Sequence, residues 1–140
     1  MNRHLLKGHY YLRRLKQVSR AITEYQHAAN SCHHHDKQAY QHALYMLAYS
    51  YAKQAESIHC DMDVLGVDLR HGTHDPYMQA AVYMRMVEND DFQPQRFHLP
   101  KIPAHSRKEM EAAVNDMGAV DVLPVQKPRV TEKLRYALGL

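Results

Sequence analysis

A chain of 140 residues is long enough for one domain with a single modest core, and no apolar run approaches the length of a membrane span. The formal net charge is +3, but residues 1–30 carry six Lys and Arg against one Glu (+5), whereas residues 61–95 carry two Arg against seven Asp and Glu (−5). Two cysteines are too few for a disulfide framework and no secretory signal is recognisable, so we expect a protein of the reducing cytoplasm with no membrane partner.

The hydrophobic periodicity predicts an all-α fold that begins with a long antiparallel helical hairpin. Its first helix is expected over about residues 3–29, where apolar residues recur at steps of three and four: Tyr11, Leu15, Val18, Ile22, Tyr25 and Ala29. Its second helix is expected over about 37–58, with Asp36 as N-cap. This is the central helix, because apolar and aromatic residues cover most of its circumference. From His59 to Gly72 the pattern is lost, which predicts a structured loop.

A third helix is expected over about residues 76–89. Pro76 suits the first helical position, where its missing N–H is not needed, and Thr73 or Asp75 can serve as the cap. Together with the hairpin, this helix is expected to complete a core domain that spans residues 1–91.

Residues 92–140 are predicted to form an extended, irregular arm, because five of the six prolines lie there. One short helix is expected in the arm over about 107–117, with Ser106 and Glu109 as a capping box and Gly118 at its end. The arm either wraps the helical body or stays extended until a partner orders it.

The aromatic composition indicates a binding surface. Ten Tyr, eight Met and twelve His stand against two Phe and no Trp, and Tyr and Met are typical of adaptable interfaces, although cores use them as well. Fingerprints of recognisable enzymes are absent from the sequence, so no catalytic residue is predicted. The main hypothesis is therefore a non-enzymatic adaptor or regulatory protein (a client chaperone, an inhibitor or an assembly factor). It would bind a protein partner, or a second copy in a homodimer, through a helical face formed by Tyr45, Met46, Tyr49, Tyr83 and Met86.

The basic first helix supports an alternative hypothesis, which is nucleic-acid binding. Arg13, Lys16 and Arg20 share one helical face and Arg14 lies beside them, so that they could follow a line of phosphates. Tyr10 could stack on a base. The same face could equally be solvated, or could dock on the acidic region of its own chain or of a second copy.

A second alternative is a metal site of histidine and cysteine. His59, Cys60, His71 and His74 form two close pairs of ligands that zinc accepts. The paired C-x2-C or H-x3-H spacing of structural zinc sites is missing, so solvated or capping histidines are the simpler interpretation. Apart from zinc at this site, no cofactor is expected.

Overall fold

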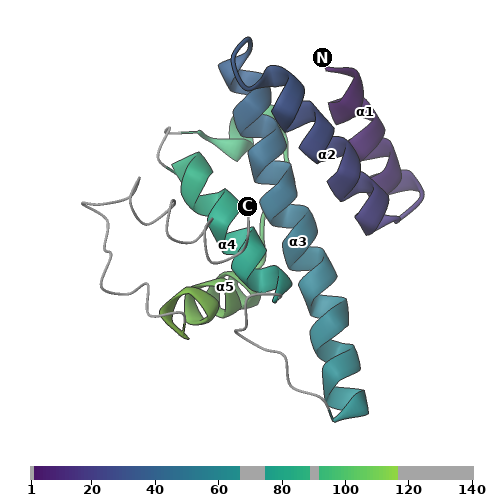
Figure 1. Cartoon of the computed structure of the whole chain (residues 1–140), viewed down its shortest axis with the longest axis vertical. Helices are drawn as coiled ribbons and strands as arrows, with labels where there is room; N and C mark the ends of the chain where they lie inside the picture. The colour runs from purple at the N-terminus through teal and green to yellow at the C-terminus, as the bar shows by residue number, and fades with distance from the viewer. Residues whose placement is uncertain (1, 67–74, 89–91, 117–140) are drawn as a thin grey trace.

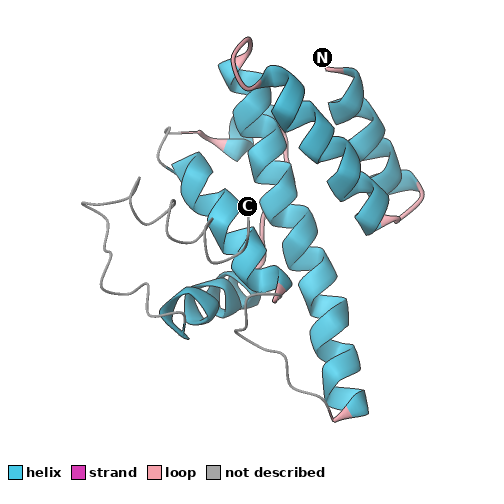
Figure 2. Ribbon diagram, viewed as in Figure 1, coloured by secondary structure: helices cyan, strands magenta, loops and turns pink. Residues whose placement is uncertain are grey.

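The computed structural model describes residues 2–66, 75–88 and 92–116, and every regular element within these ranges is helical (Figures 1 and 2). The elements are α1 (Arg3–His9), a π-helix (Tyr10–Arg14), α2 (Val18–Cys32), α3 (Lys37–Leu65), α4 (Pro76–Glu88), a 3-10 helix (Pro94–Phe97) and α5 (Ala104–Asp116). The predicted all-α fold is confirmed.

The prediction of one continuous first helix is wrong, because the chain reverses near residue 16. Lys16 has a φ of 53°, in the left-handed region, and the Gln17 N–H donates to the Tyr11 carbonyl at 2.8 Å. α1 therefore folds back along α2, and His4 Nδ1 lies 2.7 Å from Glu24 Oε2. A residue in the left-handed region cannot continue an α-helix. The apolar residues expected to share one helix are thus divided among the π-helix, the reversal and α2.

The antiparallel pairing of α2 and α3 is confirmed, and so is the cap between them. Asp36 Oδ1 accepts the Ala39 N–H at 3.1 Å, which satisfies one of the unpaired donors at the start of α3. The predicted end of this helix near residue 58 is wrong. α3 continues to Leu65, and Gly66 follows it with a φ of 71°, the left-handed conformation that glycine adopts at helix ends.

α4 lies where it was predicted and is described over Pro76–Glu88, while residue 89 lies outside the described residues. Asp75 is its cap, with Oδ1 accepting the Tyr77 N–H at 3.0 Å, while Thr73 lies outside the described residues. α5 begins at Ala104, so the predicted capping box is wrong: Ser106 is inside the helix, buried, and donates to Glu56 Oε1 at 3.2 Å. The structure describes α5 to Asp116, and Gly118 lies beyond that point.

α3 is the central helix, as expected. α2 packs on one side of it and α4 on the other, with α1 outside α2 and α5 outside α4 (Figure 1). One core cluster runs through all five helices and includes large buried residues of each side: Leu5, Tyr25, Leu44, Tyr45, Met46, Leu47, Met78, Val82, Ile102 and Met110.

The described part of the Pro-rich arm wraps the helical body. The Tyr45 hydroxyl donates to the Pro100 carbonyl at 2.6 Å, which fastens the arm to α3. Phe92 and Phe97 stack on each other with their ring centroids 5.3 Å apart, and Phe92 also lies 6.0 Å from the Tyr45 ring. These contacts fix the course of the arm across one face of α3.

The core contains a polar group that is expected to lower stability. Ser50 on α3 is fully buried, and its hydroxyl has no hydrogen-bond partner among the described residues. We expect Ser50→Ala to raise the free energy of unfolding by about 0.5–1 kcal/mol, because an unpaired buried hydroxyl is costly and alanine favours helix. Urea denaturation followed by circular dichroism measures the change. Ser31→Ala is the control, since the Ser31 hydroxyl donates to the Ala28 carbonyl at 3.1 Å. A loss of stability in Ser50→Ala would contradict the expectation.

Candidate functional site

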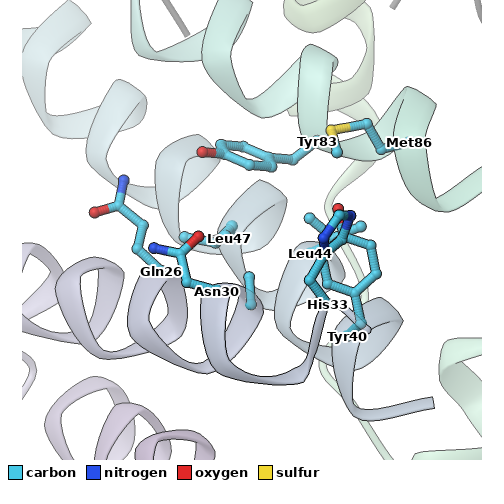
Figure 3. A pocket seen from close by; sticks show the side chains of 9 residues that line it. Gln26, Asn30, His33, Tyr40, Leu44, Leu47, Tyr83 and Met86 are labelled. Atoms are coloured by element: carbon cyan, nitrogen blue, oxygen red, sulfur yellow. The ribbon is translucent and has the colours of Figure 1, made fainter. Parts of the chain in front are cut away.

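A groove between α2, α3 and α4 has a volume of about 390 Å³ and is shown in Figure 3. We call it the helical groove. Its floor is apolar, because Leu44 and Leu47 of α3 are buried beneath it. The α4 wall presents Tyr83 and Met86, and Tyr40 lies half-buried near one end. The α2 wall is polar and presents Gln26 and Asn30, together with His33 directly after the end of the helix. The groove therefore combines an apolar floor with hydrogen-bonding groups along one side.

Ring contacts hold the α4 wall in place. Tyr83 stacks on Tyr51 with centroids 5.7 Å apart and an interplanar angle of 5°, and Gln26 Nε2 donates to the Tyr51 hydroxyl at 3.1 Å. Burial, reinforced by the neighbouring Tyr83, raises the pKa of Tyr51 to about 12, so this hydroxyl keeps its proton at neutral pH. Gln26 and Tyr51 thus link α2 to α3, and the stacked rings link α3 to α4.

The structure divides the predicted partner-binding residues among three places. Tyr83 and Met86 line the helical groove. Tyr45 and Met46 are buried in the core, with 2% and 0% of their surfaces exposed, so they cannot contact a partner without unfolding. Tyr49 lines a second groove, described next, on the opposite side of α3. The contribution of the α2 wall could not be predicted, because nothing in the sequence pattern distinguishes Gln26, Asn30 and His33 from a solvated helical face.

The second groove has a volume of about 440 Å³ and lies beside the chain reversal at Lys16. Three cations line it (Arg13, Lys16 and Lys53), together with four apolar or aromatic residues (Leu12, Val18, Tyr49 and Pro100). We call it the cationic groove. Leu47 of the helical groove and Tyr49 of the cationic groove are two positions apart on α3, a rotation of about 200°. The two grooves therefore lie on opposite sides of this helix.

The predicted nucleic-acid residues are all exposed, but only two of them line the cationic groove. Arg13 and Lys16 do, whereas Arg14, Arg20 and Tyr10 lie outside it. The Arg20 guanidinium lies 5.8 Å from the centroid of the Tyr11 ring. Lys53 could not be grouped with these residues in advance, because it is distant from them in the chain and only the fold brings it to the groove.

A chain of hydrogen-bonded polar side chains crosses the interior between α1, α2 and α3. The Tyr25 hydroxyl lies 2.7 Å from His9 Nδ1, and His9 Nε2 lies 3.2 Å from His42 Nε2. Burial lowers the pKa of His9 to about 4, with smaller contributions from His42 and from Arg13. Burial, with Arg13, also lowers the pKa of His42, and burial raises the pKa of Tyr25. All three side chains are therefore neutral at pH 7.

The residues predicted to hold zinc do not converge in the part of the chain that the structure describes. His59 Nε2 lies 3.1 Å from Asp75 Oδ1, and the imidazole meets the Tyr77 ring edge-on at 4.7 Å. Cys60 is exposed, and His71 and His74 lie outside the described residues. Within residues 2–66, 75–88 and 92–116, no group of three or more His, Cys, Asp and Glu is placed to hold a metal ion. Zinc binding stays a prediction.

None of the described helices is both long enough and apolar enough to cross a membrane. No family model, no curated protein and no solved structure matches the chain. The two grooves are therefore the features of the described structure that indicate a function.

Proposed function

We propose that this protein is a non-enzymatic adaptor or regulator that binds a protein partner in the helical groove. The observation that carries the proposal is the groove of about 390 Å³ in which half-buried Tyr83, Met86 and Tyr40 surround the buried Leu44 and Leu47. Tyrosine and methionine are enriched where proteins bind each other, because they bury much apolar area and adapt to the partner's shape.

The two walls specify the chemistry of the partner segment. The apolar floor and the α4 wall suit one or two aliphatic or aromatic side chains, as in the insertion of an amphipathic helix into a groove. Gln26, Asn30 and His33 on the α2 wall can exchange hydrogen bonds with polar groups beside those anchors. A second copy of this chain is one such partner, and so is an unrelated protein of the cytoplasm.

The test compares groove variants with a matched variant outside the groove. We expect Tyr83→Ala and Met86→Glu each to weaken partner binding at least about tenfold, the loss typical of an interface anchor. Tyr10→Ala removes the same side chain as Tyr83→Ala, but at an exposed position outside the groove, and should leave binding unchanged. Binding is measured by quantitative co-purification from lysate with and without nuclease, and circular dichroism confirms that each variant folds. Unchanged recovery with both groove variants would refute the proposal.

Nucleic-acid binding is the second candidate, favoured by the exposure of Arg13, Arg14, Lys16, Arg20 and Tyr10 around one chain reversal. Phosphate contacts of this kind are salt-sensitive. Under this alternative, changing Arg14 and Arg20 to Glu together would eliminate retardation of DNA or RNA at low salt, whereas Tyr83→Ala would not. The absence of any retardation of DNA or RNA by the unaltered protein at low salt would dispose of this candidate.

A further inference from the structure

The cationic groove lies on the other side of α3 from the helical groove, and the two share no lining residue. The lining of the cationic groove has a definite chemistry, with cations and apolar surface meeting in one cavity. We infer that the cationic groove binds a small organic anion that has an apolar body, of the class of long-chain or aromatic carboxylates. This inference does not depend on the helical groove.

The apolar part of the site accounts for the body of the ligand. Leu12, Val18, Tyr49 and Pro100 are each half-buried, so each leaves part of its apolar surface facing the groove. The volume of about 440 Å³ falls in the range of about 300–1,000 Å³ that is typical of small-molecule sites. Covering this surface with an aliphatic chain removes apolar area from water on both partners, which favours binding.

The cations account for the charge of the ligand. Arg13, Lys16 and Lys53 come from the π-helix, the chain reversal and α3, and no carboxylate is among the described residues that line the groove. Their positive charge is therefore not neutralised within the lining. The effect of Arg13 on the pKa values of His9 and His42 is consistent with this positive field. A carboxylate at the rim would neutralise part of it.

The groove favours a small organic anion over a nucleic acid. A nucleic-acid strand needs a row of phosphate contacts and an open aromatic face on which a base can stack. Among the described residues, three cations line the groove, and Arg14 and Arg20 lie outside it. The one aromatic ring of its described lining, Tyr49, already has the Lys53 ammonium 5.8 Å from its centroid. A base would have to displace that cation.

Contacts behind the lining hold the site in shape. The Tyr45 hydroxyl fastens Pro100 to α3, and the hydrogen bond from the Gln17 N–H to the Tyr11 carbonyl fixes the chain reversal. A backbone that is already in place lowers the ordering cost of binding, which raises affinity.

The experiment is calorimetric titration of the full chain with four probes: decanoate, 1-decanol, inorganic phosphate and a single-stranded oligonucleotide. We expect decanoate to bind one to one. Decanol, which lacks the charge, and phosphate, which lacks the apolar chain, should each bind at least about tenfold more weakly. Equal binding of decanoate and decanol, tighter binding of phosphate, or tighter binding of the oligonucleotide would each overturn the inference.

Two variants locate the binding site. Lys53→Met removes an exposed charge and keeps the aliphatic stem, and Lys16→Gly removes a cation where a φ of 53° favours glycine, so neither substitution should impair folding. Each should weaken decanoate binding about fivefold, the effect of one partly exposed charge pair. Arg14→Met is the matched control outside the groove. Decanoate binding that is unchanged in both groove variants, or weakened as much by Arg14→Met, would also overturn the inference.

Discussion

Replacing Gly8 with alanine is expected to lower the free energy of unfolding by about 2 kcal/mol. A Cβ at position 8 would lie 2.5 Å from Tyr25 Cε1 and 2.8 Å from two further ring carbons, closer than atoms can approach. The Tyr25 ring is fully buried and cannot swing away. Overpacking typically costs about 1–3 kcal/mol, and a contact this short against a buried ring belongs at the upper end of that range. The gain of about 1 kcal/mol in helix propensity offsets only part of it.

Urea denaturation measures this change, and a second background identifies its cause. In a Tyr25→Ala background the clash is absent, so adding Gly8→Ala should be neutral or stabilising. The two substitutions should therefore be strongly non-additive, as expected for residues in contact. A higher unfolding midpoint for Gly8→Ala in the unaltered protein would show that α1 does not pack on Tyr25 as described.

Acid is expected to destabilise the fold through His9. Its pKa is lowered from 6.5 to about 4 in the folded chain, so between these values the unfolded chain binds more protons than the folded one. Stability is therefore fully present above about pH 6.5 and is lost as the pH falls toward 4. Because His9 is only half-buried, we discount the full shift and expect a loss of about 1–2 kcal/mol. His42, whose pKa is also lowered, adds to the loss.

The matched variant for this prediction is His9→Gln, which keeps a hydrogen-bonding side chain but does not titrate. The free energy of unfolding is measured between pH 4 and pH 7 for both proteins, and the difference between the two curves cancels the contributions of the other titrating groups. We expect the unaltered protein to lose more stability than His9→Gln over this range. Parallel curves would refute the proposed role of the Tyr25–His9–His42 chain.

Local signals in the sequence were sufficient for several elements of the fold. Pro76 at a first helical position located α4, and Asp36 located the start of α3. The reversal after the π-helix was not predictable, because Leu15 continues the apolar spacing although it lies at the reversal with 43% of its surface exposed. Gly8 was the available hint, since a glycine within a helix often marks a close approach of another element.

The candidate sites were harder to predict, because they depend on which face of α3 each neighbour covers. Tyr45 and Tyr49 lie four residues apart on one face, yet the arm covers the first and leaves the second half-exposed in the cationic groove. Periodicity identifies residues that share a face but not the segment that packs on it. Lys53 lies in the same groove as Arg13 and Lys16 because the chain reverses at residue 16, and the sequence pattern did not predict this reversal.

Site-specific photo-cross-linking in living cells tests the central claim, that a protein partner occupies the helical groove. The photoreactive residue p-benzoylphenylalanine replaces Asn30 or Met86, one on each wall, and Tyr10 serves as the exposed control outside the groove. We predict that both groove positions form an adduct with the same protein, that nuclease treatment does not remove it, and that position 10 does not form it. An adduct that forms equally from position 10, or no protein adduct from either wall, would contradict the account.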